Sequence, residues 1–288
     1  MVMSAHGWMP TETRNERRPS AASRHLWGPK AYENLDFLKS RNARSLRILS
    51  EYLEPLSRFE HYEIDDTIVF MGSARLKPAD DAAAMVKAAE AGEGDLETAR
   101  QAERMSVYYE AARELAFKLT GWSKTLEEGH RRFVICTGGG PGIMEAANRG
   151  AHDAGGRSVG LGISLPFEAG VNDYVTPGLD FEFHYFFTRK LWFLYLCKAL
   201  VIFPGGFGTM DELFETLTLV QTEKIKKPLP IVLFGAEYWS QIINIDRMVD
   251  FGTISPGDVD LYFRTDSVDD AFDYLTKRLT ELGHDRLI

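Results

Sequence analysis

The sequence predicts an α/β protein, a Rossmann-like doubly wound parallel sheet with an N-terminal helical extension. Short runs of β-branched and apolar residues alternate with longer stretches of helical periodicity, and three of these runs end in glycine-rich turns. The 288 residues, of which 44% are hydrophobic, are enough to bury a full core. Strands that alternate with helices form a parallel sheet covered on both faces, with ligands bound beyond the carboxyl ends of the strands.

The chain falls into two parts by composition. Residues 1–33 mix Pro, Ser, Arg and Gly without a period, which predicts a flexible tail. Residues 34–288 are expected to form one domain. Within it, apolar residues at helical intervals predict the helical extension at 34–62, and a stretch rich in Ala, Asp and Glu predicts a solvated helical insertion at 77–102. No repeat of fixed period is visible, which argues against a solenoid.

The alternating pattern predicts the elements in order. The expected strands are 67–71, 133–137, 158–163, 199–203 and 230–234. The expected helices are 103–119, 143–154, 186–196, 210–221 and 238–249. Because the carboxyl ends of parallel strands lie at one edge of a sheet, we expect the glycine-rich turns to share a crevice.

Charge and cysteine content exclude several classes of function. The 33 basic and 42 acidic residues leave a net charge of −9, so no positive field attracts nucleic acid. Two cysteines, Cys136 and Cys197, form neither a disulfide scaffold nor a zinc cluster, and we expect buried thiols in the cytoplasm. The N-terminus lacks an apolar signal region, and no stretch approaches the roughly 18 apolar residues of a membrane span. We expect no membrane partner, no metal and no cofactor.

The glycine-rich turns are candidate phosphate-binding sites. Glycine lets the backbone approach a ligand closely, and the positive end of the following helix favours an anion. The alternative is that the glycines only allow tight turns. The candidate substrate-binding residues in these turns are Gly72, Ser73, Arg75, Gly139, Gly140, Gly205, Gly206, Gly208 and Thr209.

Two common nucleotide motifs are absent. The dinucleotide fingerprint G-x-G-x-x-G needs a third small residue, but Ile143 stands at that position after Gly138 and Gly140. No carboxylate follows the third strand to hold the ribose hydroxyls of NAD. A P-loop is also excluded, because no Gly-Lys-Ser/Thr follows any of the turns.

The segment 204–212 carries the most specific signal. It reads Pro-Gly-Gly-Phe-Gly-Thr-Met-Asp-Glu, which places Glu212 about one helical turn beyond Thr209. A carboxylate beside a phosphate cradle is unfavourable unless it addresses sugar hydroxyls or a cationic transition state. Glu212 is therefore the best catalytic candidate, and the alternative is a capping box in which it pairs with Thr209.

Three motifs carry a family resemblance. They are Pro-Gly-Gly-x-Gly-Thr-x-x-Glu at 204–212, Gly-Gly-Gly-Pro-Gly-Ile-Met-Glu-Ala at 138–146, and the pair Arg189 and Lys190. Together they closely resemble the LONELY GUY (LOG) family, long labelled "possible lysine decarboxylases", over about residues 67–233. The N-terminal helices and the segment 186–190 resemble the long-form branch, because short members commonly have Met-His-x-Arg-Lys there.

The resemblance implies cleavage of a nucleoside 5′-monophosphate to free base and ribose 5-phosphate, with Arg189 and Glu212 essential. Breaking this bond leaves positive charge on the sugar, which Glu212 would stabilise, and negative charge on the base. Arg189 is expected to act by fixed charge and hydrogen bonding, because it does not readily release a proton. Lys190, about 100° further round the helix, and Glu145 are additional candidate contacts. A decarboxylase would need a Schiff-base lysine and a pyridoxal pocket, for which no motif is present.

Three questions stay open at this stage. The substrate is expected to be a purine nucleotide, either AMP or an N6-substituted AMP such as a cytokinin nucleotide. A non-catalytic carrier of a nucleotide or a molybdopterin-type cofactor on the same fold is the alternative function. The helix 186–196 is apolar nearly all round, which predicts burial in the core or in a subunit contact, and hence a dimer or an assembly of dimers.

Overall fold

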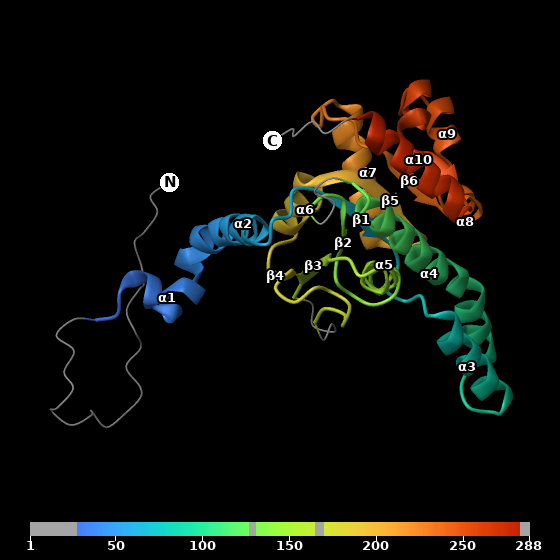
Figure 1. The fold of residues 1–288 in the computed structure, drawn as a ribbon, viewed down its shortest axis with the longest axis horizontal. Coiled ribbons are helices and arrows are strands. Elements are labelled where there is room, and N and C mark those ends of the chain that lie inside the picture. Colours follow the sequence, from blue (N-terminus) through green and yellow to red (C-terminus); the bar gives the residue numbers. More distant parts are fainter. Residues whose placement is uncertain (1–27, 127–130, 165–169, 283–288) are drawn as a thin grey trace. The chain divides into compact units, whose positions relative to one another are not determined.

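A seven-stranded parallel sheet forms the centre of the protein in the computed structural model, which describes residues 28–126, 131–164 and 170–282 (Figure 1). The strand order is β4-β3-β2-β1-β5-β6-β7, and every pair of neighbours is parallel. The strands are β1 Thr67–Met71, β2 Val134–Thr137, β3 Ser158–Ile163, β4 Asp180–Phe183, β5 Cys197–Ile202, β6 Ile231–Phe234 and β7 Phe263–Thr265. The predicted doubly wound α/β fold is confirmed.

Helices precede and connect the strands. Before β1 come the 3-10 helix η2 Ala31–Glu33, α1 Leu35–Lys39, the 3-10 helix η3 Arg41–Ala43 and α2 Arg44–His61. Between the strands lie α3 Ala79–Glu90, α4 Leu96–Ser123, α5 Ile143–Asp153, α6 Phe186–Tyr195 and α7 Phe207–Gln221. Towards the C-terminus come α8 Ala236–Ile242, α9 Ile245–Asp250, the 3-10 helix η4 Pro256–Leu261 and α10 Val268–Glu281. None of the helices within the described ranges has the length and hydropathy of a membrane span.

The alternation of side chains along each strand divides the core into two layers. In β1, Ile68 and Phe70 pack on the layer formed with α4, α5 and α10, whereas Val69 and Met71 pack on the opposite layer. That second layer contains side chains of α2, α6, α7, α8 and α9. Both faces of the sheet are therefore covered, which is why its strands are apolar nearly throughout.

The chain reverses its direction across the sheet between β1 and β5. It runs outward from β1 to β4 and then returns to β5 on the other side of β1. At this point the turns after β1 and β5 lie side by side, since the amide of Ser73 donates to the carbonyl oxygen of Pro204 at 2.9 Å. Ligands of open α/β sheets bind at such a switch point.

Contacts divide the chain into two compact units, of which the first ends at Arg47 and the second begins at Ile48. In the first unit, the side chain of Asn34 caps α1 by accepting from the amide of Phe37, and Arg47 donates to the carbonyl oxygens of Leu38 and Ser40. Most of the tail predicted at 1–33 lies outside the described residues. The domain boundary at residue 34 stays a prediction.

Several elements differ from the sequence prediction. The edge strands β4 and β7 were not predicted, because they are short and are buried on one face at most. The insertion at 77–102 is helical, but its second half is continuous with the 28-residue α4. The helix expected at 238–249 is broken into α8 and α9, where Asn244 caps α9. Helix α7 begins at Phe207, earlier than the predicted 210.

Candidate active site

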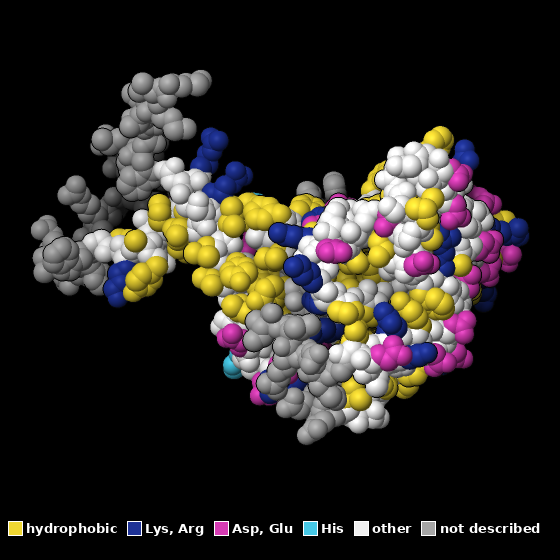
Figure 2. All heavy atoms as spheres, turned by 90° about the horizontal axis from the view of Figure 1, so that it is seen from above, with side chains coloured by type: hydrophobic (Ala, Val, Ile, Leu, Met, Phe, Trp, Pro, Cys, Tyr) yellow, Lys and Arg dark blue, Asp and Glu magenta, His cyan; other side chains and the backbone are white. Residues whose placement is uncertain are grey.

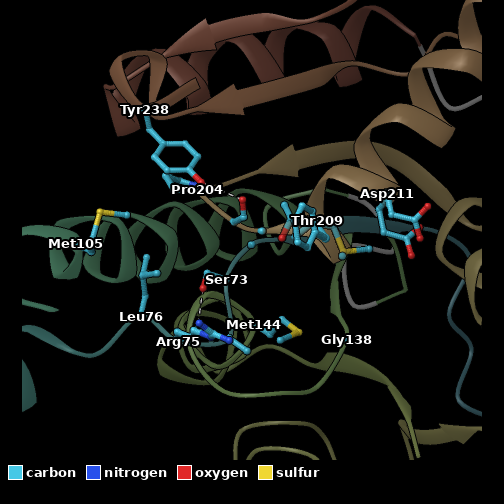
Figure 3. Close-up of a pocket in the computed structure, with 18 of the residues that line it drawn as sticks. Ser73, Arg75, Leu76, Met105, Gly138, Met144, Pro204, Thr209, Asp211 and Tyr238 are labelled. Atoms are coloured by element: carbon cyan, nitrogen blue, oxygen red, sulfur yellow. Dashed lines mark hydrogen bonds between the residues drawn. The ribbon is translucent and has the colours of Figure 1, made fainter. Parts of the chain in front are cut away.

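A cavity of about 940 Å³ opens at the carboxyl ends of β1 and β5 (Figure 3). Its described walls include residues from the turns after these strands, from α6 and α7, and from the helical insertion. In Figure 3, Met105 and Leu76 lie at one end of it and Asp211 at the other. The predicted site residues that line the cavity are Gly72, Ser73, Arg75, Arg189, Gly205, Gly206, Gly208, Thr209 and Glu212.

The start of α7 presents open backbone amides to this cavity. Gly206 is the N-cap residue and no side chain caps the helix, while the amide of Met210 makes the first intrahelical bond, to the carbonyl oxygen of Gly206 at 3.0 Å. The amides of Phe207, Gly208 and Thr209 therefore have no acceptor within the helix. Because the helix dipole is positive at this end, the arrangement favours a phosphate.

Glycine leaves the space for an anion at this turn. A methyl group added to Gly206 or Gly208 would meet no heavy atom within 4 Å. At Gly205 the reason for glycine is different, because an added methyl group would lie 2.1 Å from the hydroxyl oxygen of Thr209. The carbonyl oxygen of Gly205 accepts a hydrogen bond from the hydroxyl of Tyr238 at 3.0 Å, so the turn is supported from α8.

Glu212 lies on α7 about one turn beyond the open amides. The helix begins two residues before Thr209, so Thr209 is not its N-cap and the capping-box alternative is wrong. The side chain of Glu212 is only 12% exposed. The pKa of its carboxyl is raised to about 7, chiefly by burial and to a smaller extent by the neighbouring Glu215 and Asp211, against the opposing effect of Lys190 and Arg189. A carboxyl with this pKa can exchange a proton near neutral pH.

Lys190 lies among the acidic side chains of α7. Its Nζ is 2.6 Å from Oε2 of Glu215, 2.9 Å from Oδ2 of Asp211 and 4.0 Å from Oε2 of Glu212. Burial lowers the pKa of Lys190, but its bonds to Glu215 and Asp211 outweigh this effect and the pKa is raised. Lys190 is not among the residues that line the cavity, and it acts on the site through the charge of Glu212.

Arg189 enters the cavity from α6. Its Nε donates to the carbonyl oxygen of Leu161 at 2.6 Å, and its guanidinium lies 5.1 Å from the ring centre of Phe193. A methyl group on Gly138 would lie 2.4 Å from Nη2 of Arg189, so only glycine leaves room for the guanidinium. The structure thus brings a cation from α6 and a buried carboxyl from α7 to the walls of one cavity.

The other predicted residues have different partners. The carbonyl oxygens of Gly139 and Gly140 accept hydrogen bonds from the side chain of Asn172 at 3.0 Å each. The carboxylate of Glu145 accepts a hydrogen bond from the hydroxyl of Tyr109 at 2.8 Å. These three predicted residues do not line the cavity, whereas Gly138, which was not predicted, does.

The helical insertion supplies an unpredicted wall. Met85 of α3 and Thr98, Gln101, Ala102 and Met105 of α4 all line the cavity. No spacing in the sequence connects this segment with the turns after the strands, so only the packing of α3 and α4 places it at the site. Within the described ranges, no three His, Cys, Asp or Glu side chains gather in a way that could hold a metal ion.

Comparisons with known proteins give the following matches. The family described as "Possible lysine decarboxylase" matches residues 144–275. The cytokinin riboside 5′-monophosphate phosphoribohydrolase LOG7 of Arabidopsis thaliana is 31% identical over 154 residues, covering 52% of this chain and 64% of the relative. The probable cytokinin riboside 5′-monophosphate phosphoribohydrolase LOGL5 of Oryza sativa subsp. japonica is 32% identical over 126 residues, covering 43% of this chain and 50% of the relative. The matches thus span less than two thirds of the length of either relative.

Solved structures with a similar fold have lower sequence identity. The Moco carrier protein of Chlamydomonas reinhardtii is 21% identical with a TM-score of 0.41, covering 75% of this chain and 98% of that chain. The molybdenum cofactor binding protein of Rippkaea orientalis is 16% identical with a TM-score of 0.42, covering 74% of this chain and 95% of that chain. Neither likeness bears on what this chain binds.

Proposed function

We propose that this chain, which belongs to the LONELY GUY (LOG) family, hydrolyses the N-glycosidic bond of a purine nucleoside 5′-monophosphate to free base and ribose 5-phosphate. The observation that carries the proposal is the position of Glu212. Its buried carboxyl lies one turn beyond a helix start with open amides, in a cavity that Arg189 also lines. The names of the relatives describe enzymes that act on nucleoside 5′-monophosphates. Such a substrate agrees with a site that has one place for phosphate and one for the sugar.

The phosphate is assigned to the start of α7. The amides of Phe207, Gly208 and Thr209 bind its oxygens there, and Ser73 and Arg75 reach the nucleotide from the turn after β1. With the phosphate fixed, the ribose extends along α7 towards Glu212. Four other candidate residues are not expected to contact the substrate directly, because they have partners within the protein: Gly139, Gly140, Glu145 and Lys190.

The chemistry follows from the charges around the sugar. The bond between C1′ and the purine nitrogen breaks with both electrons leaving on the base, and a water oxygen adds to C1′. Ionised Glu212 stabilises the positive charge that develops on the ribose and accepts a proton from the attacking water. Arg189 stabilises the negative charge on the departing base by hydrogen bonding, and the base then takes a proton from solvent.

A direct test measures adenine release from AMP by chromatography. We expect wild-type protein to release adenine, and Glu212→Gln to lower kcat by about 10²- to 10³-fold while AMP binding is retained. Arg189→Ala should lower kcat by a similar factor. Glu223→Gln is the matched control, because Glu223 lies just beyond the end of α7, is exposed and does not line the cavity, and it should keep most of the wild-type rate.

The same assay distinguishes the alternative function and the base preference. Tight AMP binding by the wild type without release of adenine would support the non-catalytic carrier and contradict the hydrolase. The ratio of kcat/KM for AMP to kcat/KM for an N6-substituted AMP measures which base is preferred. The cytoplasm stays the proposed location, in keeping with the buried free thiols of Cys136 and Cys197.

Assembly of at least two copies is part of the proposal. Helix α6 is buried on one side, but Phe187, Leu191 and Tyr195 are 56%, 43% and 41% exposed and follow one another at helical spacing. On α7, Phe207 is 92% exposed. Figure 2 shows that hydrophobic side chains gather in broad patches on one face of the molecule. Such patches mark protein interfaces, so a dimer through α6 and α7 is expected.

Light scattering tests the assembly directly. The wild type should have the mass of a dimer or of a multiple of dimers, and Leu191→Glu should reduce it, because a charge in the centre of an apolar contact is costly. A wild-type protein of monomer mass would contradict this part of the proposal.

A further inference from the structure

Both carboxylate oxygens of Glu51 in α2 accept hydrogen bonds around the start of α6. Oε1 accepts from the amide of His184 at 2.8 Å, and Oε2 accepts from the amide of Tyr185 at 3.3 Å and from the hydroxyl of Thr188. The carbonyl oxygen of Glu51 accepts from the indole nitrogen of Trp192 at 2.9 Å. One residue of the helical extension therefore accepts four hydrogen bonds, two from the residues just before α6 and two from α6 itself.

Helix α6 has no N-cap side chain of its own. Its N-cap residue, Tyr185, makes no side-chain cap hydrogen bond, and the carboxylate of Glu51, from a distant part of the sequence, accepts from the amides of His184 and Tyr185 just before the helix. A negative charge is favourable at this end of a helix. At the other end, Nζ of Lys227 donates to the carbonyl oxygens of Leu194 at 3.2 Å and Tyr195 at 3.5 Å, so both ends of α6 are held by charges that complement its dipole.

Arg189 follows Thr188 directly and belongs to the turn that Glu51 holds. Its amide donates to the carbonyl oxygen of Tyr185 at 3.2 Å. Its Nε donates to the carbonyl oxygen of Leu161 and its guanidinium lies close to Gly138, and a rotation of α6 would move the side chain away from both contacts. The orientation of Arg189 therefore depends on how the first turn of α6 is anchored.

We propose that Glu51 is a positioning residue, which anchors the first turn of α6 and thereby holds the Arg189 guanidinium at the cavity wall near Glu212. This role would give the N-terminal helical extension a function in the active site, because the Glu51 carboxylate of α2 acts on Arg189 through α6. The inference rests on the proposed function for the part that Arg189 plays in catalysis. The anchoring itself rests on the four hydrogen bonds alone.

The neighbour Glu54 offers a matched control on the same helix. It lies almost one turn beyond Glu51 and forms an ion pair with Arg58. Exchange of Glu54 for Gln therefore removes a carboxylate from α2 without touching the contacts to α6. Thr188→Val provides a second variant of the anchor that keeps the shape of the buried side chain but removes the hydroxyl, which donates to Glu51 and to the carbonyl oxygen of Tyr185.

The kinetic test compares Glu51→Gln, Thr188→Val and Glu54→Gln with the wild type. In Glu51→Gln the amide nitrogen replaces an acceptor oxygen, so bonds from Tyr185 or Thr188 are lost. We expect kcat to fall about 10- to 100-fold with KM nearly unchanged, because misplacement of a group that acts in the transition state lowers kcat. Glu54→Gln should match the wild type. A lower melting temperature with unchanged kcat in both anchor variants would show a structural role only and overturn the proposal.

A second measurement needs no turnover. The charged groups that face Glu212 are Arg189 and Lys190 from α6, and Asp211 and Glu215 from α7 itself. Arg189 lowers the pKa of Glu212, so its displacement in Glu51→Gln should move the ¹³C NMR titration of the Glu212 carboxyl to higher pH, with Glu54→Gln unchanged. An identical titration in Glu51→Gln and wild type would overturn the anchoring. Absence of adenine release from wild type would overturn the hydrolase instead, and this titration would still decide the role of Glu51.

Discussion

The glycine-rich turns after β2 and β5 resemble each other in sequence but have opposite surroundings. In the turn after β2, the amide of Gly139 donates to the hydroxyl of Thr137 at 2.9 Å, and its carbonyl oxygen accepts from Asn172. A methyl group on Gly138 would collide with Arg189. In the turn after β5, a methyl group on Gly206 would meet nothing within 4 Å, and the following amides have no intrahelical acceptor.

The difference shows that glycine content alone does not identify an anion site. The turn after β2 uses glycine to let the protein pack against itself, and in particular to admit the guanidinium of Arg189. The turn after β5 uses glycine to leave backbone amides and space for a ligand. The two turns thus contribute to one cavity in different ways, the first by placing a catalytic candidate and the second by offering backbone amides for the proposed phosphate.

Among the variants that test the difference between the two turns, Gly138→Ala is expected to change kcat most. The added methyl group displaces the Arg189 guanidinium, so kcat should fall about 100-fold while the affinity for ribose 5-phosphate is kept. Steady-state kinetics with AMP and calorimetric titration with ribose 5-phosphate measure the two quantities. A normal kcat would show that this turn does not control the position of Arg189.

The second largest effect is expected in the pH dependence of kcat/KM. The turn after β5 is followed by Glu212, and burial is the main cause that raises the pKa of its carboxyl to about 7. Since ionised Glu212 is the proposed active form, kcat/KM should fall about tenfold per pH unit below that value and level off above it. A profile that bends near pH 6 would instead report the second ionisation of a phosphate group and contradict the assignment.

Gly206→Ala should weaken phosphate binding without harming the fold. The position has backbone angles that alanine tolerates and open space around it, so the added methyl group lies where the ligand is expected. KM for AMP should rise about tenfold, the loss of roughly one hydrogen bond to a charged group, while the melting temperature stays unchanged. If KM and the melting temperature both remained at wild-type values, the phosphate would have to bind elsewhere.

Gly139→Ala should lower the stability of the fold and leave substrate binding nearly unchanged, the opposite of Gly206→Ala. Of these variants it should have the smallest influence on activity. Its φ of +74° is unfavourable for alanine, and the methyl group would lie 2.8 Å from the side chain of Val171. The free energy of unfolding should fall by about 1–3 kcal/mol in a denaturant titration. The KM of the folded fraction should stay close to that of the wild type, and a large rise in KM would mean that this turn also binds the substrate.

The sequence allowed most of the sheet to be predicted, because buried parallel strands are continuous apolar runs. Runs of this kind predicted β1 and β3 with their observed bounds. The strand β4 was missed because its sequence, Asp-Phe-Glu-Phe, alternates between exposed and buried residues over only four positions. The start of α7 was placed too late, since Phe207 and Gly208 are not typical of a helix.

Helix α6 illustrates what composition alone leaves undecided. Its composition is apolar on all sides, which indicated burial in the core or in a contact between subunits. In the single chain, Trp192 and Phe193 are buried, whereas Phe187 and Leu191 are exposed. Composition does not tell which apolar face meets the sheet, because that depends on how the helix is anchored at both ends.

The sequence by itself determined which side chains are available for chemistry and how they are spaced along single elements. The segment 204–212 specifies a helix start with glycines and a carboxylate about one turn later, because such spacing is a property of local geometry. Only the tertiary structure decided that the turn after β2 is filled, that Glu51 anchors α6, and that burial raises the pKa of Glu212. These properties arise from contacts between residues far apart in the chain, and no local pattern encodes which distant residues will meet.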